Sequence, residues 1–432
     1  MRYKASIFLI LVLVVSGCGT SENGTRSAPQ FSTALQGPLN SFTVPGQLVL
    51  SDLVHSIHLS RTGSQNSAPI IRLKSNDTLS LNFDLLQFDS RSLRVSFTHH
   101  DPDWSRSNLV QEFYQEGLFN LYLDTGTVST SQRPTFRSYQ YEFPNRDVKF
   151  LVSGNYMVRV EDADTGNLLF AMPFFVAENE GDIVSRVETV LSSRAEVRYA
   201  HFPRSLFELP DFVEMPQFNL EFYYVQNQFW GRKQLAGELD TSTEGEVLFE
   251  MERQRPFNGD YEFQFLSLNN LSLSAPQISE FDPTTIPPRV VLFDDAQGFA
   301  ASRTRISGSR FGKPNPSRSA QYADVHFRLE PEDEYPEDAA IYLVGDFNNW
   351  AIQSNYAMEY DSDIDRWKTN GIIKEGSYSY KYVLIEDNRV NDLALDDSFT
   401  RVEQEYHAFV YYRDPDRNYY RLLQTNNFFA RS

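Results

Sequence analysis

The chain has 432 residues, and its length suggests about three domains, since a typical domain takes ~150 residues. Its 39 Lys and Arg against 58 Asp and Glu give a formal net charge of −19, which argues against binding to nucleic acid or to an anionic membrane surface. Hydrophobic residues make up 41% of the chain and aromatic residues 14%, too much for a disordered protein. The single cysteine excludes a disulfide framework and any multi-cysteine metal site.

The N-terminus has the features of an export signal. Arg2 and Lys4 precede an apolar segment, 7–15. This segment is too short to span a bilayer as a helix, because a spanning helix needs about 20 residues. The Val-Ser-Gly-Cys sequence that follows resembles the bacterial lipobox. We therefore expect residues 1–17 to be a lipoprotein signal peptide and Cys18 to carry a lipid anchor. The alternative is a plain signal peptide or signal anchor with a chance cysteine.

A flexible tether is predicted to follow the anchor. Residues 18–45 are rich in Ser, Gly, Thr and Pro, and such a chain has a root-mean-square reach of roughly 30 Å. The residue after Cys18 is Gly rather than Asp, and no cluster of acids follows it. By resemblance to bacterial sorting rules, this pattern favours an outer-membrane lipoprotein that faces the periplasm.

Beyond the tether the sequence is almost entirely of β type. Apolar and polar residues alternate with a period of two, which places the apolar set on one face of a sheet. The alternation is clean in the runs 79–84, 156–161, 261–265, 325–330 and 378–382. It is less clean in the run 217–226. Short strands separated by turn residues are typical of sandwiches.

We therefore predict an all-β protein built from tandem immunoglobulin-like or early-set β-sandwiches. The predicted parts are an N-terminal sandwich at 46–180, a central one at 181–298, a polar linker at 299–319 and a C-terminal early-set sandwich at 320–432. Within the central range, Ile183, Val187, Val190 and Leu191 also have helical spacing. The segment is short and rich in β-branched residues, so a strand or linker is expected there.

Three segments contain clusters of residues that could bind a metal ion or a charged partner. The segment 99–104 (HHDPDW) places adjacent histidines on opposite faces of a strand, so they cannot easily share a metal. Asp101 and Asp103 could share a calcium ion in a turn, but a plain turn with a packed Trp104 is favoured. The segment 361–372 lacks the Gly and Glu that an EF-hand loop requires, so a hairpin turn is expected. The acidic run 330–338 is expected to be a solvated loop, with attraction of a basic partner as the alternative. No catalytic residue, metal site or cofactor is predicted.

A further pattern concerns carbohydrate. The sequence VGDFNNW at 344–350, followed by YSYKY at 378–382, resembles the early-set domain of starch-branching enzymes and of glycogen-binding kinase subunits. The resemblance implies that Trp350 and Lys381 occupy two of the family's glucan-binding positions. The second Trp of that family is missing, since residues 385–392 contain no aromatic side chain. This departure favours a packing role for Trp350 over sugar binding.

From about residue 55 to residue 423, the chain resembles the type IX secretion system plug protein family of Bacteroidetes. Its motifs occur in family order, and they include FTHHDPDW, YQYEFPN, KFLVSGNY, PFNGDYEFQFLSL and EQEYHAFVYYRDPDRNYYRLL. One departure is His100, which stands where the family commonly has Cys.

The resemblance implies a non-enzymatic lipoprotein that plugs the periplasmic opening of the giant outer-membrane β-barrel translocon. The implied partners are that barrel and, through Cys18, the lipid bilayer. A glycan-binding lipoprotein that uses the C-terminal domain is the second hypothesis, and an enzyme is the third.

Overall fold

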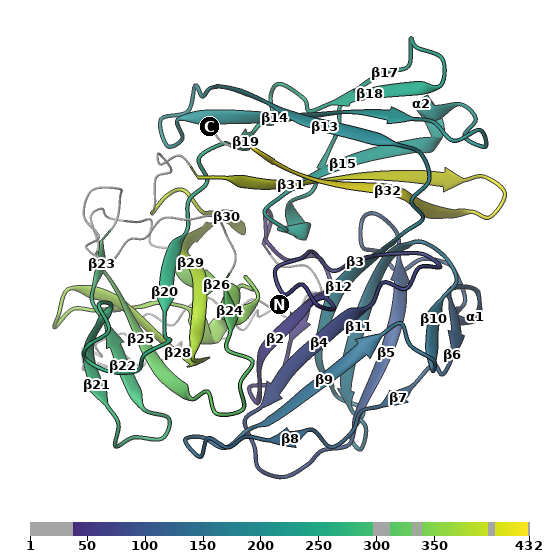
Figure 1. Ribbon diagram of the computed structural model, residues 1–432. Helices are drawn as coiled ribbons and strands as arrows, with labels where there is room; N and C mark the ends of the chain where they lie inside the picture. The colour runs from purple at the N-terminus through teal and green to yellow at the C-terminus, as the bar shows by residue number, and fades with distance from the viewer. Residues whose placement is uncertain (1–37, 297–311, 331–334, 336–338, 396–401, 431–432) are drawn as a thin grey trace, which may run out of the picture.

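The computed structural model describes residues 38–296, 312–330, 335, 339–395 and 402–430. Strands account for most of the ordered backbone, and they form three β-sandwiches that pack against one another (Figure 1). The prediction of an all-β protein with tandem sandwiches is therefore confirmed. Within the described ranges, no helix combines the length and the hydrophobicity that crossing a bilayer requires. The predicted signal peptide and Cys18 lie outside these residues.

The first sandwich consists of two mainly antiparallel sheets that face each other across a shared core. The larger sheet has the order β1-β12-β11-β5-β7, with β3 added in parallel to β12. The smaller sheet has the order β2-β4-β9-β8. The strands are β1 (Leu48–Val49), β2 (Val54–Arg61), β3 (Ile70–Arg72), β4 (Leu79–Leu85), β5 (Leu93–His100), β7 (Leu121–Tyr122), β8 (Thr127–Val128), β9 (Arg137–Phe143), β11 (Gly154–Asp162) and β12 (Leu168–Ala177). A small ribbon of β6 (Gln115–Gly117) and β10 (Val148–Phe150) follows the short helix α1 (Gln111–Tyr114).

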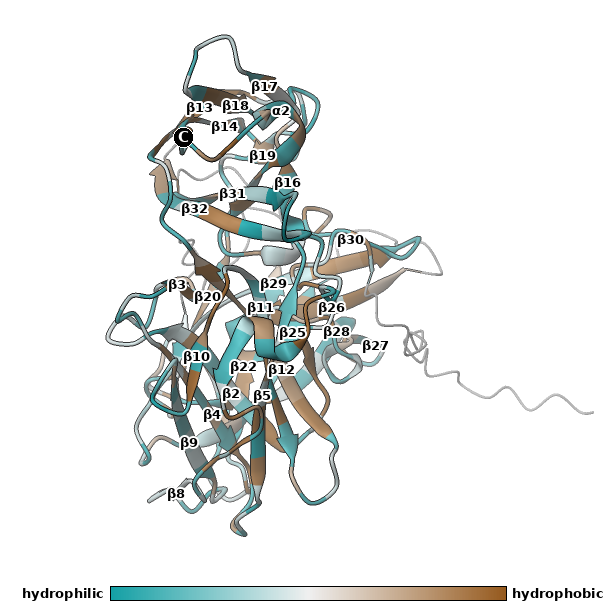
Figure 2. Ribbon diagram, turned by 90° about the vertical axis from the view of Figure 1, so that its right-hand side faces the viewer, coloured by the Kyte–Doolittle hydropathy of each residue, from teal (hydrophilic) through white to brown (hydrophobic). Residues whose placement is uncertain are grey.

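The alternation read from the sequence explains how this sandwich forms. Leu79, Leu81 and Phe83 of β4 point into the core and are at most 1% exposed. Their polar neighbours in the same strand lie on the opposite face of the sheet, because side chains alternate along a strand. Figure 2, coloured by hydropathy, shows apolar and polar segments following one another along the strands.

The central sandwich, at the top of Figure 1, is assembled from two distant parts of the chain. One sheet has the order β13-β14-β18-β17, with β19 paired to β14, and the other has the order β16-β15-β31-β32. The elements are β13 (Ile183–Leu191), β14 (Tyr199–Glu208), α2 (Pro216–Asn219), β15 (Leu220–Gln226), η1 (Trp230–Arg232), β16 (Gln234–Leu235), β17 (Glu238–Asp240), β18 (Glu246–Glu250), β19 (Phe257–Asn258), β31 (Gln404–Asp414) and β32 (Tyr419–Ala430). The segment Ile183–Leu191 is thus a strand, as expected.

The third sandwich also combines two sheets around one core. One sheet has the order β20-β29-β24, with β26 and β30 also paired to β29, and the other has the order β21-β22-β25-β28-β27, with β23 paired to β25. The elements are β20 (Gln264–Ser267), β21 (Ile278–Asp282), β22 (Arg289–Leu292), β23 (Asp295–Ala296), β24 (Lys313–Pro314), β25 (Tyr322–Glu330), β26 (Ala340–Gly345), η2 (Asp346–Asn348), η3 (Ser354–Tyr356), β27 (Glu359–Asp361), β28 (Arg366–Lys374), β29 (Gly376–Glu386) and β30 (Arg389–Asn391).

The strand pairing crosses the predicted boundaries between the central and C-terminal ranges. β31 pairs with β15 over seven register positions, so residues 404–430 complete the central sandwich. Conversely, β20 pairs with β29 and β22 pairs with β25, so residues 264–292 belong to the third sandwich. Local alternation predicts a strand but not its partner, and these partners are far apart in the sequence.

Packed residues occur before the predicted end of the tether at residue 45. Phe42 is 2% exposed and Val44 is 3% exposed. The backbone N–H of Leu39 donates to the carbonyl of Asn388, and that of Val390 donates to the carbonyl of Leu39. Burial of two apolar side chains outweighs the Ser- and Pro-rich composition of this segment. Residues 38–45 are therefore a packed part of the protein.

Candidate functional site

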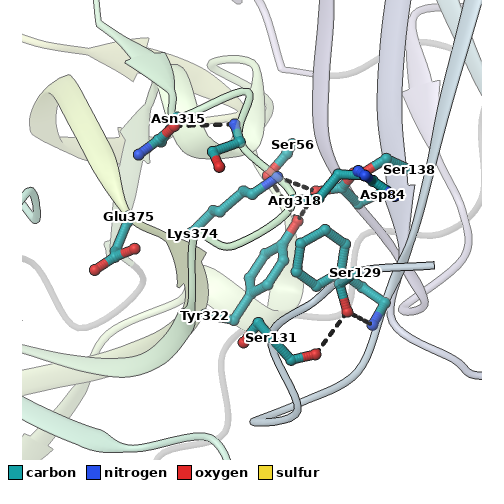
Figure 3. A network of polar contacts seen from close by, with 12 residues as sticks. Ser56, Asp84, Ser129, Ser131, Ser138, Asn315, Arg318, Tyr322, Lys374 and Glu375 are labelled. Carbon is teal, nitrogen blue, oxygen red and sulfur yellow. Dashed lines mark hydrogen bonds and ion pairs between the residues drawn. The ribbon is translucent and has the colours of Figure 1, made fainter. Parts of the chain in front are cut away.

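The three sandwiches meet at buried junctions, and each junction contains a charged pair. The first of these joins the first sandwich to the third (Figure 3). Lys374 Nζ lies 2.7 Å from Asp84 Oδ2, and both side chains are at most 5% exposed. The hydroxyl of Tyr322 donates to the same oxygen at 2.7 Å, and that of Ser138 donates to Asp84 Oδ1 at 2.6 Å. Ser56 completes the network, with its Oγ 2.8 Å from the Tyr322 hydroxyl.

Aromatic rings enclose this network. Lys374 Nζ lies 4.5 Å from the centroid of the Phe136 ring, a cation–π distance. Phe136 in turn packs edge-on against Tyr322, with 5.2 Å between the ring centroids. Burial raises the pKa of the Tyr322 hydroxyl well above its usual value, and the charge of Asp84 raises it further. The Tyr322 hydroxyl therefore stays protonated and serves as a hydrogen-bond donor.

A second charged pair joins the central sandwich to the third. Arg232 Nη1 lies 2.5 Å from Asp392 Oδ2, and the hydroxyl of Tyr261 donates to the same oxygen. The Arg232 guanidinium also lies 3.6 Å from the centroid of the Phe42 ring. Burial by itself would raise the pKa of Asp392, but the charge of Arg232 holds it below its usual value. Asp392 is therefore ionised, and its charge is compensated inside the protein.

A third charged pair joins the first sandwich to the central one. Arg421 contacts Glu178 through two nitrogens, at 2.5 and 2.9 Å, in the bidentate geometry that suits a carboxylate. Nearby, the Tyr411 hydroxyl donates to Asn155 Oδ1 at 2.6 Å. Hydrogen bonding to Glu178 raises the pKa of Arg421 above its already high value. The two residues are 243 positions apart in the chain.

Apolar clusters fill the rest of the junctions. Between the first and central sandwiches, Phe175 packs against Trp230 and Phe409, with ring centroids 5.0 and 4.9 Å apart. Between the central and third sandwiches, Phe229 packs against Trp350 at 5.0 Å. Burial of such rings is the main stabilising term at a junction. The three sandwiches therefore form one interlocked body.

The structure places Trp350 and Lys381 inside this body. Trp350 is 1% exposed and its indole N–H donates to Asp346 at 2.8 Å. Lys381 is fully buried, and its ammonium donates to the carbonyl of Glu262 at 3.0 Å, above the ring of Tyr261. Neither side chain offers a face to a sugar ring. Phe42 and Phe229 pack against the Trp350 ring, so both residues of the carbohydrate-binding hypothesis lie in the packed interior of this structure.

The histidine-rich segment forms a turn. Trp104 is 5% exposed, and its carbonyl lies 2.9 Å from His100 Nδ1. Asp103 accepts hydrogen bonds from the backbone and the hydroxyl of Ser105. Across the described ranges, no group of three or more His, Cys, Asp or Glu side chains has a metal-binding arrangement.

The structure describes the segment 361–372 fully and the acidic run 330–338 only in part. Residues 359–374 form the predicted hairpin of β27 and β28, with Asp361 opposite Arg366. Most of the acidic run 330–338 lies outside the described residues.

His99 gives the chain a pH-dependent element. The ring is 1% exposed, with Nε2 3.0 Å from the carbonyl of Ser153 and Nδ1 2.8 Å from the hydroxyl of Ser107. Burial lowers the pKa of His99 to about 4. The unfolded chain binds a proton at the ordinary value of about 6.5, so the stability that neutral His99 contributes is complete above that pH and is lost as the pH falls toward 4.

We expect the free energy of unfolding to fall by about 2 kcal/mol between pH 7 and pH 5 on account of His99 alone. Urea unfolding at both pH values measures this change. In His99→Gln the decrease in the free energy of unfolding from pH 7 to pH 5 should be smaller by about 2 kcal/mol, whatever the variant's stability at pH 7. If the free energy of unfolding decreased equally in the wild type and the variant, His99 would not be the source of the pH dependence.

Comparison with known proteins relates these features to a family. Residues 54–178 match the family model of the type 9 secretion system plug protein 1st domain. The match runs from the start of β2 to just beyond β12, which is the first sandwich. A search of curated proteins found no match.

Solved structures extend the likeness to the whole fold. The crystal structure of a hypothetical protein from Parabacteroides merdae ATCC 43184 superimposes with a TM-score of 0.80 at 21% identity, covering 89% of this chain and 99% of that chain. The three-sandwich arrangement thus occurs in a solved structure. The C-terminal domain of the antigen I/II-family protein AspA of Streptococcus pyogenes gives a TM-score of 0.14 at 7% identity, covering 86% and 99% of the two chains. That value is too low to indicate a common fold.

The fold and its junctions define a protein of three interlocked β-sandwiches. Its first sandwich, residues 54–178, matches the family of the type 9 secretion system plug protein 1st domain. Its role is therefore related to type IX secretion, in the cell envelope.

Sequence reasoning missed the charged residues at the junctions. Asp84 and Lys374 occupy strand positions where a polar residue normally faces water. Arg232 and Asp392 lie in short connecting segments, and no motif marks them. The sequence contains no direct signal for these pairs. Two opposite charges can be recognised as a pair only when the sandwiches that carry them are placed together.

Proposed function

We propose that the chain is a non-enzymatic lipoprotein that closes the periplasmic opening of the giant outer-membrane β-barrel translocon of type IX secretion. The observation that carries this proposal is the match of residues 54–178 to the first domain of the plug proteins. A barrel wide enough for folded cargo has a water-filled lumen, which leaks unless something blocks it.

The interlocked body supports the role of a stopper. A plug that seals a wide pore must keep its shape, and three buried or partly buried charged pairs with aromatic clusters connect the sandwiches to one another. The β-sandwich satisfies its own backbone hydrogen bonds, so its surface can remain polar and in contact with water. The net charge of −19 keeps that surface hydrated.

The lipid anchor completes the proposal. Cys18 precedes the first described residue by 20 positions, a tether whose root-mean-square reach is about 25 Å when it is flexible. Confinement near the outer membrane raises the effective concentration of the plug at the pore. Capture and release then require only a modest interface.

Replacing the anchor residue tests this part. Cys18→Ser should move the chain from the detergent phase to the aqueous phase in a Triton X-114 partition of envelope extracts. Immunoblotting measures the distribution, and Ser21→Ala is the control that should stay in the detergent phase. A Cys18→Ser chain that is processed and still partitions with detergent would contradict lipidation at this position.

The proposal as a whole is tested by affinity purification in the native bacterium. The full chain with a C-terminal tag is isolated in gentle detergent and its partners are identified by mass spectrometry. A very large outer-membrane barrel should co-purify, and more of it when cargo export is stopped. Isolation of the chain alone, or with polysaccharide-uptake proteins, would overturn the proposal.

A further inference from the structure

A groove of about 880 Å³ lies between the first and third sandwiches. Its floor is the outer face of β2, β4 and β9, and its opposite wall is the segment Lys313–Arg318, which begins with β24. The buried Asp84–Lys374 pair lies among the lining residues, so the groove follows the junction that this pair holds together. Its volume lies within the ~300–1,000 Å³ that ligand sites commonly have.

The floor carries hydroxyl and amide side chains in register. Across the three strands, His58 is opposite Asn82, which is opposite Gln140. In the next row, Ser60 is opposite Ser80, which is opposite Glu142. An amide group offers both donors and an acceptor, so this floor can bond to donors and acceptors alike.

Two of these amides are already partly engaged through nitrogen. Asn82 Nδ2 donates to Ser80 Oγ at 3.1 Å, and Gln140 Nε2 donates to the same oxygen at 3.4 Å. Gln140 Nε2 also donates to Glu142 Oε1 at 3.4 Å. Both amides thus use their nitrogens as donors within the floor, and their oxygens can accept from an incoming N–H. Ser80, which is 8% exposed, accepts both bonds.

The charges that line the groove are of both signs. Lys313 and Arg318 lie on the wall of the third sandwich, and Arg61, Asp124 and Glu142 lie on the first sandwich. Such a lining repels neither sign strongly and selects no polyanion. It suits a ligand that is neutral overall and rich in hydrogen-bonding groups.

Two ligand classes have that chemistry, polypeptide backbone and carbohydrate. Sugar rings are usually held against an exposed aromatic face. The aromatic lining residues here are Phe83 and Tyr139, which are 1% and 4% exposed. A polypeptide needs no such platform, because its N–H and C=O groups repeat along the chain and pair with amide and hydroxyl side chains.

We propose that this groove binds an extended polypeptide segment of a type IX secretion partner. The class of ligand follows from the lining, and the identity of the partner rests on the proposed function. Because the two walls belong to different sandwiches, a bound segment bridges the first sandwich and the third. Gln140, which is exposed and central on the floor, is the residue best placed to report the contact.

Photo-crosslinking in the native bacterium tests the proposal with the full chain. Benzoylphenylalanine is introduced at Gln140 as the probe, and at Thr189, an exposed residue of β13 outside the groove, as the control. After irradiation, adducts are mapped by mass spectrometry. We expect several-fold more adduct at Gln140 than at Thr189, and the adducts should map to one contiguous segment of a type IX secretion protein. Adding Asn82→Arg, which fills the groove, should abolish that adduct while the melting temperature shows a folded chain.

The outcomes separate this inference from the proposed function. If the barrel co-purifies but Gln140 forms no more adduct than Thr189, the groove inference fails and the plug proposal stands. Adducts that contain sugar instead of peptide would also overturn the groove inference. If Gln140 captures a polypeptide segment that belongs to no secretion protein and no barrel co-purifies, the proposed function fails, while peptide binding in the groove stands.

Discussion

Lys374→Met is expected to lower the free energy of unfolding by about 3–5 kcal/mol, because it leaves the carboxylate of Asp84 charged and buried between two sandwiches. The hydroxyls of Tyr322 and Ser138 still donate to that carboxylate, but they carry no compensating charge. Denaturant unfolding measures the loss. The first and third sandwiches should also separate more readily, which limited proteolysis detects.

A matched exposed pair provides the control for this effect. Lys368 Nζ lies 2.7 Å from Asp361 Oδ2, but the two side chains are 49% and 22% exposed. Lys368→Met should therefore cost only about 0–1 kcal/mol. The double variant Asp84→Asn with Lys374→Met should lose less than the sum of the single variants, because neither change then leaves an unpaired charge. Equal losses for Lys374→Met and Lys368→Met would contradict the account of this junction.

Trp350→Ala is expected to cost about 3–5 kcal/mol, the range for removing a large aromatic side chain from a packed interior. The ring packs against Phe42, Phe229 and Phe263, with centroids 5.4, 5.0 and 5.2 Å away. The variant also removes the hydrogen bond to Asp346. The measurement is thermal or denaturant unfolding, together with protease sensitivity of the connection between the central and third sandwiches.

Phe218 supplies the control for the loss of an aromatic ring. It is 75% exposed on α2, so Phe218→Ala should change stability by less than about 0.5 kcal/mol. Trp350→Ala with unchanged stability would show that this ring is not a junction residue. A wild-type chain that binds immobilised α-glucan through Trp350 would contradict the buried position described here.

The sequence alone was sufficient for the class of fold because alternation is a local property. Leu79, Leu81 and Phe83 could be assigned to one buried face without knowledge of any partner strand. The pairing of residues 404–430 with β15 could not be predicted, since strand partners are chosen by contacts across long sequence separations. A chain that returns to an earlier sandwich therefore looks like a separate domain when it is read in order.

The residues of the candidate site also differ in how far the sequence predicts their role. The missing second Trp favours packing for Trp350, and the rings that pack against it in the structure, Phe42 and Phe229, belong to other parts of the chain. Asp84 and Lys374 carry no local signal, because a charged residue at a polar strand position looks solvent-exposed until a second sandwich covers it. Long-range packing, and not residue type, decides their role.

The measurement that tests the central proposal most directly is the conductance of the purified translocon barrel in a planar bilayer. Addition of the full chain on the periplasmic side should close the large open conductance, and washing out the chain should restore it. The same addition on the opposite side should have no effect. If the chain binds the barrel at saturation and the conductance does not change, the chain does not plug the pore.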